Sequence, residues 1–433
     1  MTQTRARPTL LSILLCLSLA AHADGYATAR AKLVEAYQAG DFAGMQEAAR
    51  ASLTARPDYP GALFNLALAQ TLADDPDAAL QTLARLTDLD VDLGVDINAA
   101  FEPLRELDGW ARLVERIAAL RQPVGNAVIA WQGVDGGFVP EGIAVDGNAV
   151  YLGSIRRGSI DRIDDDGVHT ILAPGHRDVG SIYGMRLVRA GRFDPELRYE
   201  NVADRLLYAT AATEQLVHEP DFSGSRLCEI ELARPEPRCI ALPARGDARQ
   251  TLGDFIEING LYYTADQTDG PLYVYDPDSE RWGTVVEKGQ LVSPQGLVDA
   301  PSSEHLYVAD YRGGVYRVRL DGYAALERVK SEASLYGIDG LYRYGDWLIA
   351  VQNGITPHRV SAHRLADDGL TVIESRILLM NHPDFDEPNL GEVVGDDLFL
   401  VANSHWNRFK PDNTLPEGLS GPVVLKLSLT SLR

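Results

Sequence analysis

The sequence predicts an all-β six-bladed β-propeller preceded by a small all-α helical domain. Three observations support this fold class. The spacing of apolar residues changes from a helical period of 3.6 to a strand period of 2 after residue 122, one strand pattern then recurs six times, and Gly, Asp and Asn turns separate the strands to the C-terminus. We therefore divide the chain into 1–23, 24–122 and 123–433, a leader, a helical domain and a propeller.

The first 23 residues have the pattern of a secretory signal peptide. Arg5 and Arg7 precede an apolar run, residues 10–19, and Ala21-His22-Ala23 forms a small-x-small cleavage site. We expect cleavage before Asp24 and a mature protein in the periplasm or outside the cell. The run is about half of the roughly 20 apolar residues that span a bilayer, and no later stretch approaches that length, so we expect no membrane span.

The charge balance excludes one class of partner. Among 433 residues, 62 are acidic and 40 are basic, which gives a formal net charge of −22. A nucleic acid is bound largely by basic side chains that neutralise its phosphates. We therefore expect no nucleic-acid partner.

Two cysteines follow the leader, and they flank an expected hairpin. Cys228 and Cys239 enclose a segment that contains Pro235 and Pro237. In an exported protein such a pair predicts a disulfide, which would stabilise the fold by about 2–3 kcal/mol because the loop it closes is short. The alternative is a pair of buried free thiols on neighbouring strands.

The helical domain contains an internal repeat. Gly40-Asp41 recurs 34 positions later as Asp74-Asp75, and each pair lies between two amphipathic stretches. Thirty-four residues is the tetratricopeptide period, so the segment resembles about two such repeats with a closing helix over 101–120. Two repeats are few for a peptide-binding groove. Two roles stay open for this domain: it stabilises the propeller, or it recruits a protein partner.

The propeller is predicted from a four-strand unit of about 30 residues. Its first copy places strands at 143–145, 149–153, 159–163 and 168–172, with turns at Asp146-Gly147, Arg157-Gly158 and Asp166-Gly167. The second strand of the unit recurs at 206–209, 261–266, 306–310, 347–350 and 398–402. Six copies predict six blades, and residues 127–131 are expected to close the last blade onto the first.

Polar side chains open and end these strands at positions that a propeller brings to one face. The strand-start residues are Glu141, Tyr183, Asp254, Gln295, Asp339 and Asn389, and the strand-end residues are Asp266, Asp310, Asn353 and Asn403. Carboxylate and amide oxygens without histidine or thiol are the donors that suit calcium. Asp and Asn are also common turn residues, and we expect Asp266 and Asp310 to form turns rather than bind an ion. Four loop histidines, at 176, 358, 382 and 405, match no metal motif.

The blade openings resemble one superfamily of propellers. The segments 138–143, 293–297 and 338–341 read Phe-Val-Pro-Glu-Gly-Ile, Ser-Pro-Gln-Gly-Leu and Ile-Asp-Gly-Leu. They are similar to those of the gluconolactonase, senescence-marker protein and luciferin-regenerating enzyme superfamily, over about residues 126–433. The resemblance implies a six-bladed propeller that hydrolyses lactones or related esters with one axial divalent metal, often calcium, held by a Glu, an Asn and an Asp.

Carried over by position, the resemblance implies metal ligands in this chain. The family Glu falls on Glu141 and the family Asp on Asp339, while the family Asn falls on Gln295. A further family Asn falls on Gly253, with Asp254 following it. These two departures leave three outcomes open: a shifted metal, a different substrate or a loss of catalysis.

The sequence thus leads to one hypothesis with two alternatives. The leading hypothesis is an exported calcium-type hydrolase of small lactones or esters. In it Glu141 and Gln295 are ligands, Asp339 is both ligand and proton acceptor, and Tyr183, Asp254 and Asn389 contact substrate. The first alternative is a non-catalytic propeller that binds a ligand or a protein partner. The second is a propeller with a purely structural metal.

Overall fold

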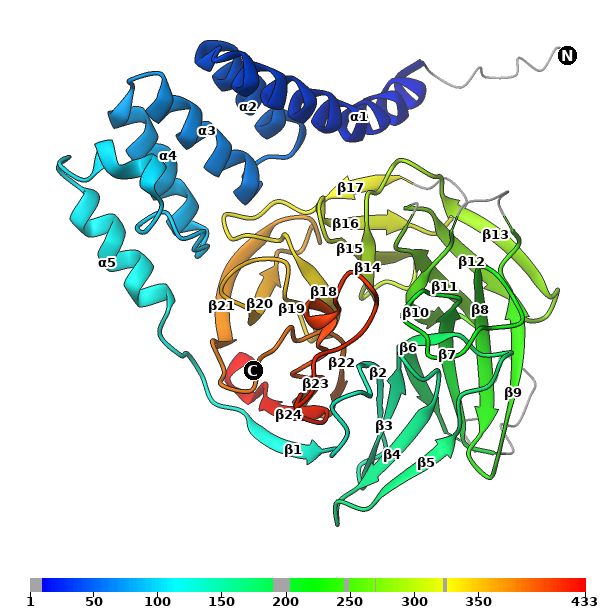
Figure 1. Cartoon of the computed structure of the whole chain (residues 1–433). Helices are drawn as coiled ribbons and strands as arrows, with labels where there is room; N and C mark the ends of the chain where they lie inside the picture. The colour runs from blue at the N-terminus through cyan, green and yellow to red at the C-terminus, as the bar shows by residue number, and fades with distance from the viewer. Residues whose placement is uncertain (1–9, 190–202, 245–248, 269, 322–324) are drawn as a thin grey trace, which may run out of the picture. The chain divides into compact units, whose positions relative to one another are not determined.

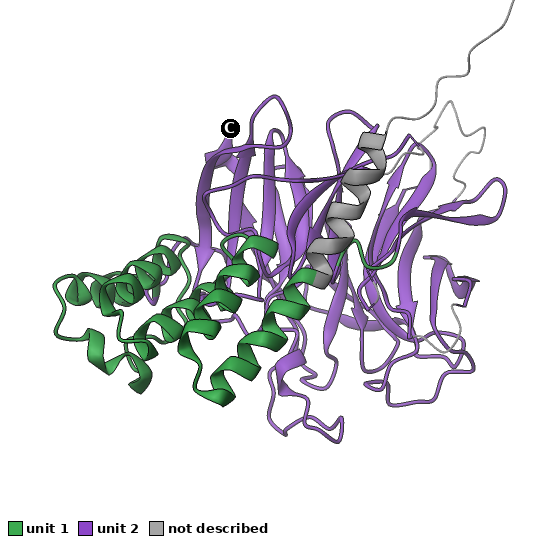
Figure 2. Ribbon diagram, turned by 90° about the horizontal axis from the view of Figure 1, so that it is seen from above, with its two compact units in different colours: residues 1–120, 288–291 green, residues 121–287, 292–433 purple. Residues whose placement is uncertain are grey.

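The computed structural model describes residues 10–189, 203–244, 249–268, 270–321 and 325–433, without the side chains of residues 10–24. Two compact units make up the chain. One comprises residues 1–120 with 288–291, and the other comprises 121–287 with 292–433 (Figure 2).

The helical unit is built from antiparallel helices whose starts are set by the repeat. Its elements are α1 (Leu10–Ala39), α2 (Phe42–Ala55), α3 (Pro60–Leu72), α4 (Pro76–Asp88), the 3₁₀ helix η1 (Ala99–Leu104) and α5 (Trp110–Leu120). Asp41 caps α2 by accepting from the Gly44 amide, and Asp75 caps α4 by accepting from the Ala78 amide. The 34-residue repeat therefore marks two equivalent helix starts. Membership of the tetratricopeptide class stays a prediction.

The single closing helix expected over 101–120 is wrong, because the chain forms two elements there. The 3₁₀ helix η1 contains Pro103, which donates no backbone hydrogen bond, and Gly109 has a φ of +107° directly before α5. Within α5 the buried residues Trp110, Leu113, Ile117 and Leu120 follow a helical spacing.

The second unit is a six-bladed propeller, as predicted. Six four-stranded antiparallel sheets are arranged as a ring in Figure 1. The first three blades are β2 (Pro140–Val145), β3 (Ala149–Ser154), β4 (Ile160–Asp164) and β5 (His169–Ala173); β6 (Ser181–Val188), β7 (Arg205–Ala211), β8 (Ser225–Glu231) and β9 (Arg234–Ala241); β10 (Leu252–Ile258), β11 (Leu261–Asp266), β12 (Leu272–Asp276) and β13 (Arg281–Val286). The others are β14 (Pro294–Asp299), β15 (His305–Asp310), β16 (Gly314–Arg319) and β17 (Leu326–Arg328); β18 (Ile338–Tyr344), β19 (Trp347–Gln352), β20 (Arg359–Leu365) and β21 (Val372–Met380); β22 (Gly391–Val394), β23 (Asp397–Val401), β24 (Val423–Ser428) and β1 (Val128–Gln132).

The ring is closed by the strand that the sequence predicts for this role. β1 precedes the first blade in the chain and pairs antiparallel with β24 of the sixth, with Val128 opposite Lys426 and Gln132 opposite Val423. Closure in this way removes the exposed edges that an open array of blades would carry. Apolar layers then fill the spaces between blades; Trp131, Phe138 and Phe399, for example, belong to a layer shared by the sixth and first blades.

Five of the six innermost strands, all except β22, carry a β-bulge at the step that the sequence marks with glycine. In the first blade Pro140 pairs with Ser154 and Ile143 with Leu152, so Glu141 and Gly142 face one residue, Gly153. A Cβ on Gly142 would lie 2.1 Å from the carbonyl oxygen of Tyr183 in the next blade. Glycine is therefore needed where adjacent inner strands approach each other, and the bulge sets the direction of the preceding side chain.

The predicted disulfide is present. Cys228 on β8 and Cys239 on β9 are bonded, and they are directly opposite each other in the ladder. The two strands form the hairpin that the sequence indicates, with residues 232 and 233 between them.

No helix in the described part of the chain combines the length and apolarity needed to cross a bilayer. Helix α1 runs from Leu10 to Ala39, through the predicted cleavage site before Asp24. Residues 1–9 of the predicted leader lie outside the described residues.

Candidate functional site: paired axial carboxylates

Glu141 is a buried carboxylate of the predicted mouth. It lies in the bulge of β2, and the residue is 4% exposed. Its Oε2 accepts hydrogen bonds from Asn389 Nδ2 at 2.7 Å and from Trp406 Nε1 at 2.6 Å. Among the described residues, Oε1 has no hydrogen-bond partner. One oxygen of Glu141 is thus fixed by two donors, while the other is left for a ligand.

Asp339 lies in the equivalent bulge of β18 and has the same one-sided arrangement. Its Oδ2 accepts a hydrogen bond from Asn353 Nδ2 at 2.7 Å, and Tyr311 donates to Asn353 Oδ1 at 2.8 Å. Asn353 was predicted at the mouth as a strand-end residue, and the structure brings it to Asp339. No described residue forms a hydrogen bond with Oδ1 of Asp339.

The two carboxylates disfavour each other's ionisation. Burial raises the pKa of Glu141 well above its ordinary value, and repulsion from Asp339 raises it further; hydrogen bonds from Trp406 and Asn389 lower it in part. Burial likewise raises the pKa of Asp339 to about 7, against a hydrogen bond from Asn353 and with repulsion from Glu387 and Asp254. Such a pair of like charges out of water is stabilised by a proton or by a cation.

Three residues next to the site have unusual backbone geometry. Val139, Glu387 and His405 have φ values of +52°, +65° and +60°, in the left-handed region that residues other than glycine rarely occupy. They lie one or two positions before Glu141, Asn389 and Trp406, the members of the first hydrogen-bonded group. Backbone strain of about 1–3 kcal/mol per residue is concentrated at functional sites, because the surrounding structure must maintain it there.

Gln295, the predicted third ligand, occupies the bulge of β14 but is already bonded. Its Oε1 accepts a hydrogen bond from Gln267 Nε2, and its Nε2 donates to Ser293 Oγ at 3.3 Å. To bind an ion with its amide oxygen, Gln295 would exchange or share the Gln267 contact.

The three predicted substrate-binding residues are all buried near the carboxylates. Asn389 donates to Glu141, as described above, and is 0% exposed. Burial, followed by repulsion from Glu141, raises the pKa of Tyr183. Asp254 is ion-paired with Arg186 at 2.9 Å and accepts from the Phe255 amide at 2.9 Å.

Asp254 also differs from the other strand-start residues in its position. In the third blade Gly253 and Asp254 face Ala265, so Gly253 has the place of Glu141 and Asp254 has the place that Gly142 occupies. The reversed order Gly-Asp in the sequence is the signal for this difference.

Other predicted mouth residues stabilise loops. Asp266 accepts from the Thr251 and Thr268 amides, and Asp310 accepts from the Val292, Ser293 and Arg312 amides, as expected of turn residues. Asn403 donates to the carbonyl oxygen of Gly421 and accepts from the Val423 amide, so it holds its own loop.

Sequence reasoning missed Trp406 and Glu387. Trp406 lies between β23 and β24, and its indole donates to Glu141; Glu387 precedes β22, and its charge acts on both Glu141 and Asp339. The available signal was the unusual length of the last unit: residues 402–422 separate its second and third strands, whereas residues 311–313 do so in the fourth.

The donor set fits a hard divalent cation at Glu141 and Asp339. Both carboxylates keep one oxygen without a described partner, and both are held in an environment that raises the free energy of their charged forms. No cluster of three or more Asp, Glu, His or Cys side chains arranged for a metal occurs among the described residues. A cation here would therefore depend on two carboxylates together with neutral oxygens, such as amides or water.

No protein-family model and no curated protein matches this sequence. Among solved structures, the chain is similar to luciferin-regenerating enzyme, with a TM-score of 0.47 and 12% identity over 71% of this chain and 96% of that one. A calcium-binding protein, regucalcin, from Agrobacterium tumefaciens gives 0.45 and 13% over 69% and 93%. A putative oxidoreductase (glucose dehydrogenase) from Thermus thermophilus gives 0.44 and 12% over 69% and 99%. At this similarity the comparisons add no argument about chemistry, and the fold itself is shown by the six sheets.

Proposed function

We propose that the propeller is a divalent-cation-dependent hydrolase of small lactones or esters, with calcium as the cation. One observation supports the cation most strongly: two carboxylates, the buried Glu141 and the half-buried Asp339, repel each other while each keeps one oxygen without a described hydrogen-bond partner. The resemblance of the blade openings to the gluconolactonase superfamily supports the reaction class.

In this proposal the chain's own residues orient the reacting groups. Asn389 holds Glu141 through Oε2 and Oε1 is left for the ion, while Trp406 bonds the same Oε2 in the structure. Asn353 holds Asp339 through Oδ2, which leaves Oδ1 to bind the ion or to accept a proton from an attacking water. When bound, the cation would supply Lewis-acid stabilisation of the developing oxyanion.

The remaining predicted residues have supporting roles in the proposal. Gln295 supplies a neutral oxygen to the ion once it turns from Gln267. Tyr183 forms part of the buried wall beside Glu141, where a substrate ring would pack. Asp254 is ion-paired with Arg186. We therefore assign it the role of positioning Arg186 beside the site instead of the direct substrate contact that the sequence predicts.

A screen of lactones and aryl esters with and without calcium tests the hydrolase. We expect turnover that EDTA abolishes and calcium restores, and we expect Glu141→Gln to abolish it. The matched control is Glu287→Gln, an exposed carboxylate of the same unit, which should keep parental turnover. Calcium-independent turnover, or turnover retained in Glu141→Gln, would contradict the proposal.

A binding propeller without turnover is the second candidate. It is favoured by the absence of a side chain at Gly253 and by the bonded amide of Gln295, the two positions that depart from the superfamily pattern. Calcium binding without hydrolysis of any substrate in the screen would favour this candidate.

We also propose that the protein is exported and that cleavage occurs before Asp24. Intact-mass measurement of protein from a periplasmic extract should give a chain that begins at Asp24. A full-length mass with cytoplasmic fractionation would contradict export.

A protein partner of the helical unit is a separate proposal. Capture of one specific protein by residues 24–433, lost when residues 24–122 are deleted, would support it.

A further inference from the structure

One connection on the face of the propeller that carries the site is longer than each of its five counterparts. The links between second and third strands of the six blades cover residues 155–159, 212–224, 267–271, 311–313, 353–358 and 402–422. The last of these contains the 3₁₀ helix η2 (Trp406–Arg408). Trp406, Phe409 and Leu415 from this segment pack against the apolar cluster that contains Val139 and Tyr183. A segment of the sixth blade thus covers residues of the first and second blades.

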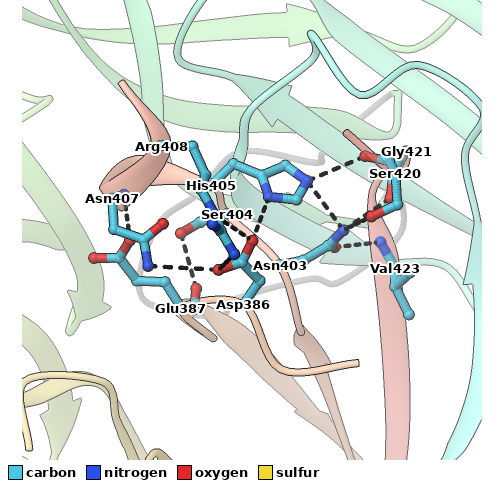
Figure 3. Close-up of polar contacts among 10 residues, drawn as sticks. All are labelled: Asp386, Glu387, Asn403, Ser404, His405, Asn407, Arg408, Ser420, Gly421 and Val423. Carbon is cyan, nitrogen blue, oxygen red and sulfur yellow. Dashed lines mark hydrogen bonds and ion pairs between the residues drawn. The ribbon is translucent and has the colours of Figure 1, made fainter. Parts of the chain in front are cut away.

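A polar cluster fixes the base of this segment (Figure 3). His405 Nδ1 lies 3.0 Å from Asp386 Oδ2, and Arg408 bonds the same carboxylate through Nε at 3.0 Å and Nη2 at 3.2 Å. Although partial burial opposes ionisation, the hydrogen bonds from Arg408 and His405 lower the pKa of Asp386. His405 and Arg408, which flank Trp406 and Asn407, are therefore both bonded to Asp386, which lies in the connection between β21 and β22.

Glu387 adds a second set of anchors. Its Oε2 accepts from the Asn407 amide at 2.6 Å, and its carbonyl oxygen accepts from Ser404 Oγ at 2.8 Å. His405 is also held from the other side, because its Nε2 lies 3.1 Å from the carbonyl oxygen of Ser420. The cluster fixes the backbone of residues 404–408, from which Trp406 reaches Glu141.

Trp406 and Asn389 donate hydrogen bonds to the same carboxylate oxygen of Glu141. Two N–H donors at 2.6 and 2.7 Å occupy both lone pairs of Glu141 Oε2, so this oxygen has no capacity for a cation while the indole is in place. A ligand that takes both oxygens of Glu141 has to displace the indole.

We infer that Trp406 is a gate on Glu141, carried by residues 403–422, and that Asp386 is the positioning residue that holds the gate closed. The effect of the gate on calcium binding rests on the proposed function. The existence of a closed and an open state of the segment does not depend on it. Ligand entry breaks the indole hydrogen bond to Glu141, and loss of the Asp386 anchors favours the open state.

Calcium affinity tests the gate. Trp406→Phe keeps an aromatic ring but removes the N–H donor, so we expect it to bind calcium about tenfold more tightly than the parent, the value of one charge-assisted hydrogen bond. A residue that only stabilised the fold would not increase affinity when altered. Equal or weaker binding by Trp406→Phe would overturn the gate.

Hydrogen exchange of the full chain tests the anchor independently of calcium. We expect Asp386→Ala to raise amide exchange in residues 403–422 by about tenfold, because those amides are protected by local hydrogen bonds. Asp384→Ala is the matched control: it lies in the same connection but pairs with His382 at 3.6 Å, and it should leave this exchange unchanged. Asp386→Glu should restore part of the protection.

The outcomes separate this inference from the proposed function. No calcium binding by parent or variants would contradict the metal site, and the exchange data alone would then decide the role of Asp386. Exchange that stays unchanged in Asp386→Ala, or that rises equally in all blades, would overturn the anchor even if calcium binds.

Discussion

Two buried polar regions of the propeller differ in how completely their hydrogen bonds are satisfied. In the fifth blade, Gln352 donates to the carbonyl oxygens of Ser334 and Tyr336 and accepts from Arg359 and Ser361. The network continues from Ser361 to His363 at 2.9 Å and from His363 to Ser375 at 2.9 Å. At the axis, Glu141 and Asp339 each keep one oxygen without a described partner and repel each other.

This contrast separates buried polar groups that stabilise the fold from those that are kept for a ligand. A satisfied network stabilises one arrangement of its blade, and the loss of any member leaves a costly unpaired group. A half-satisfied pair of like charges lowers stability, and the flanking backbone strain at Val139 and Glu387 lowers it further. We expect substitutions in the two regions to have opposite effects on stability.

Glu141→Gln should have the largest effect on function and a favourable effect on stability. Glutamine keeps an oxygen that accepts from Asn389 and Trp406 but loses the charge that repels Asp339. We expect calcium affinity to fall by more than about tenfold, or 1.4 kcal/mol, while the free energy of unfolding without metal stays equal or rises. Calorimetry and urea denaturation measure the two quantities. A clear loss of stability without metal would place Glu141 with the structural network instead.

Gln352→Leu should have the largest effect on stability. It removes the acceptor that Arg359 Nε and Ser361 Oγ share and the donor to two backbone carbonyls, and we expect a loss of about 3 kcal/mol. Gln267→Leu is the matched control at the axis, where the partner Gln295 also bonds Ser293, and it should cost less than about 1 kcal/mol. Equal losses in the two variants, measured by urea denaturation, would remove the contrast between the regions.

The two regions should contribute to the free energy of unfolding with opposite dependence on pH. Burial lowers the pKa of His363 from 6.5 to about 3, so the unfolded chain binds a proton first as the pH falls. This contribution to stability is complete at neutral pH and is lost as the pH falls from about 6.5 towards 3. The pKa of Asp339 is raised from 3.8 to about 7, so its contribution is present below about 4 and is lost as the pH rises to about 7.

Substitutions at Asp339 and His363 test whether these two residues cause the predicted changes in stability with pH. In EDTA, Asp339→Asn should keep the stability that the parent loses between about pH 4 and pH 7. His363→Gln should lower stability overall but should flatten its fall towards acid pH. Unfolding curves across this pH range measure both slopes, and a parental slope unchanged by Asp339→Asn would refute the assignment at the axis.

Gln295→Asn should have the smallest effect. The shorter amide matches the superfamily pattern and no longer reaches Gln267, which frees its oxygen for the ion. We expect calcium affinity to rise by about threefold, less than one hydrogen bond is worth. A fall in affinity would show that the longer Gln295 side chain already reaches the ion.

The fold followed from local patterns, whereas the site followed only in part. The repeated strands, the closing strand over 127–131 and the pairing of Cys228 with Cys239 depend on spacing that is visible in the chain. The X-Gly steps located Glu141 and Asp339, because a bulge needs glycine where strands approach closely. Trp406 was missed, because its contact with Glu141 joins residues 265 positions apart and depends on a long irregular segment.

Calorimetric titration of the metal-stripped protein with calcium, beside Asp339→Ala, is the decisive test of an axial cation site. We expect one site per chain with micromolar affinity in the parent and no detectable binding in the variant, with both proteins folded by circular dichroism. No binding to the parent, or equal binding by the variant, would contradict an axial cation site at Glu141 and Asp339.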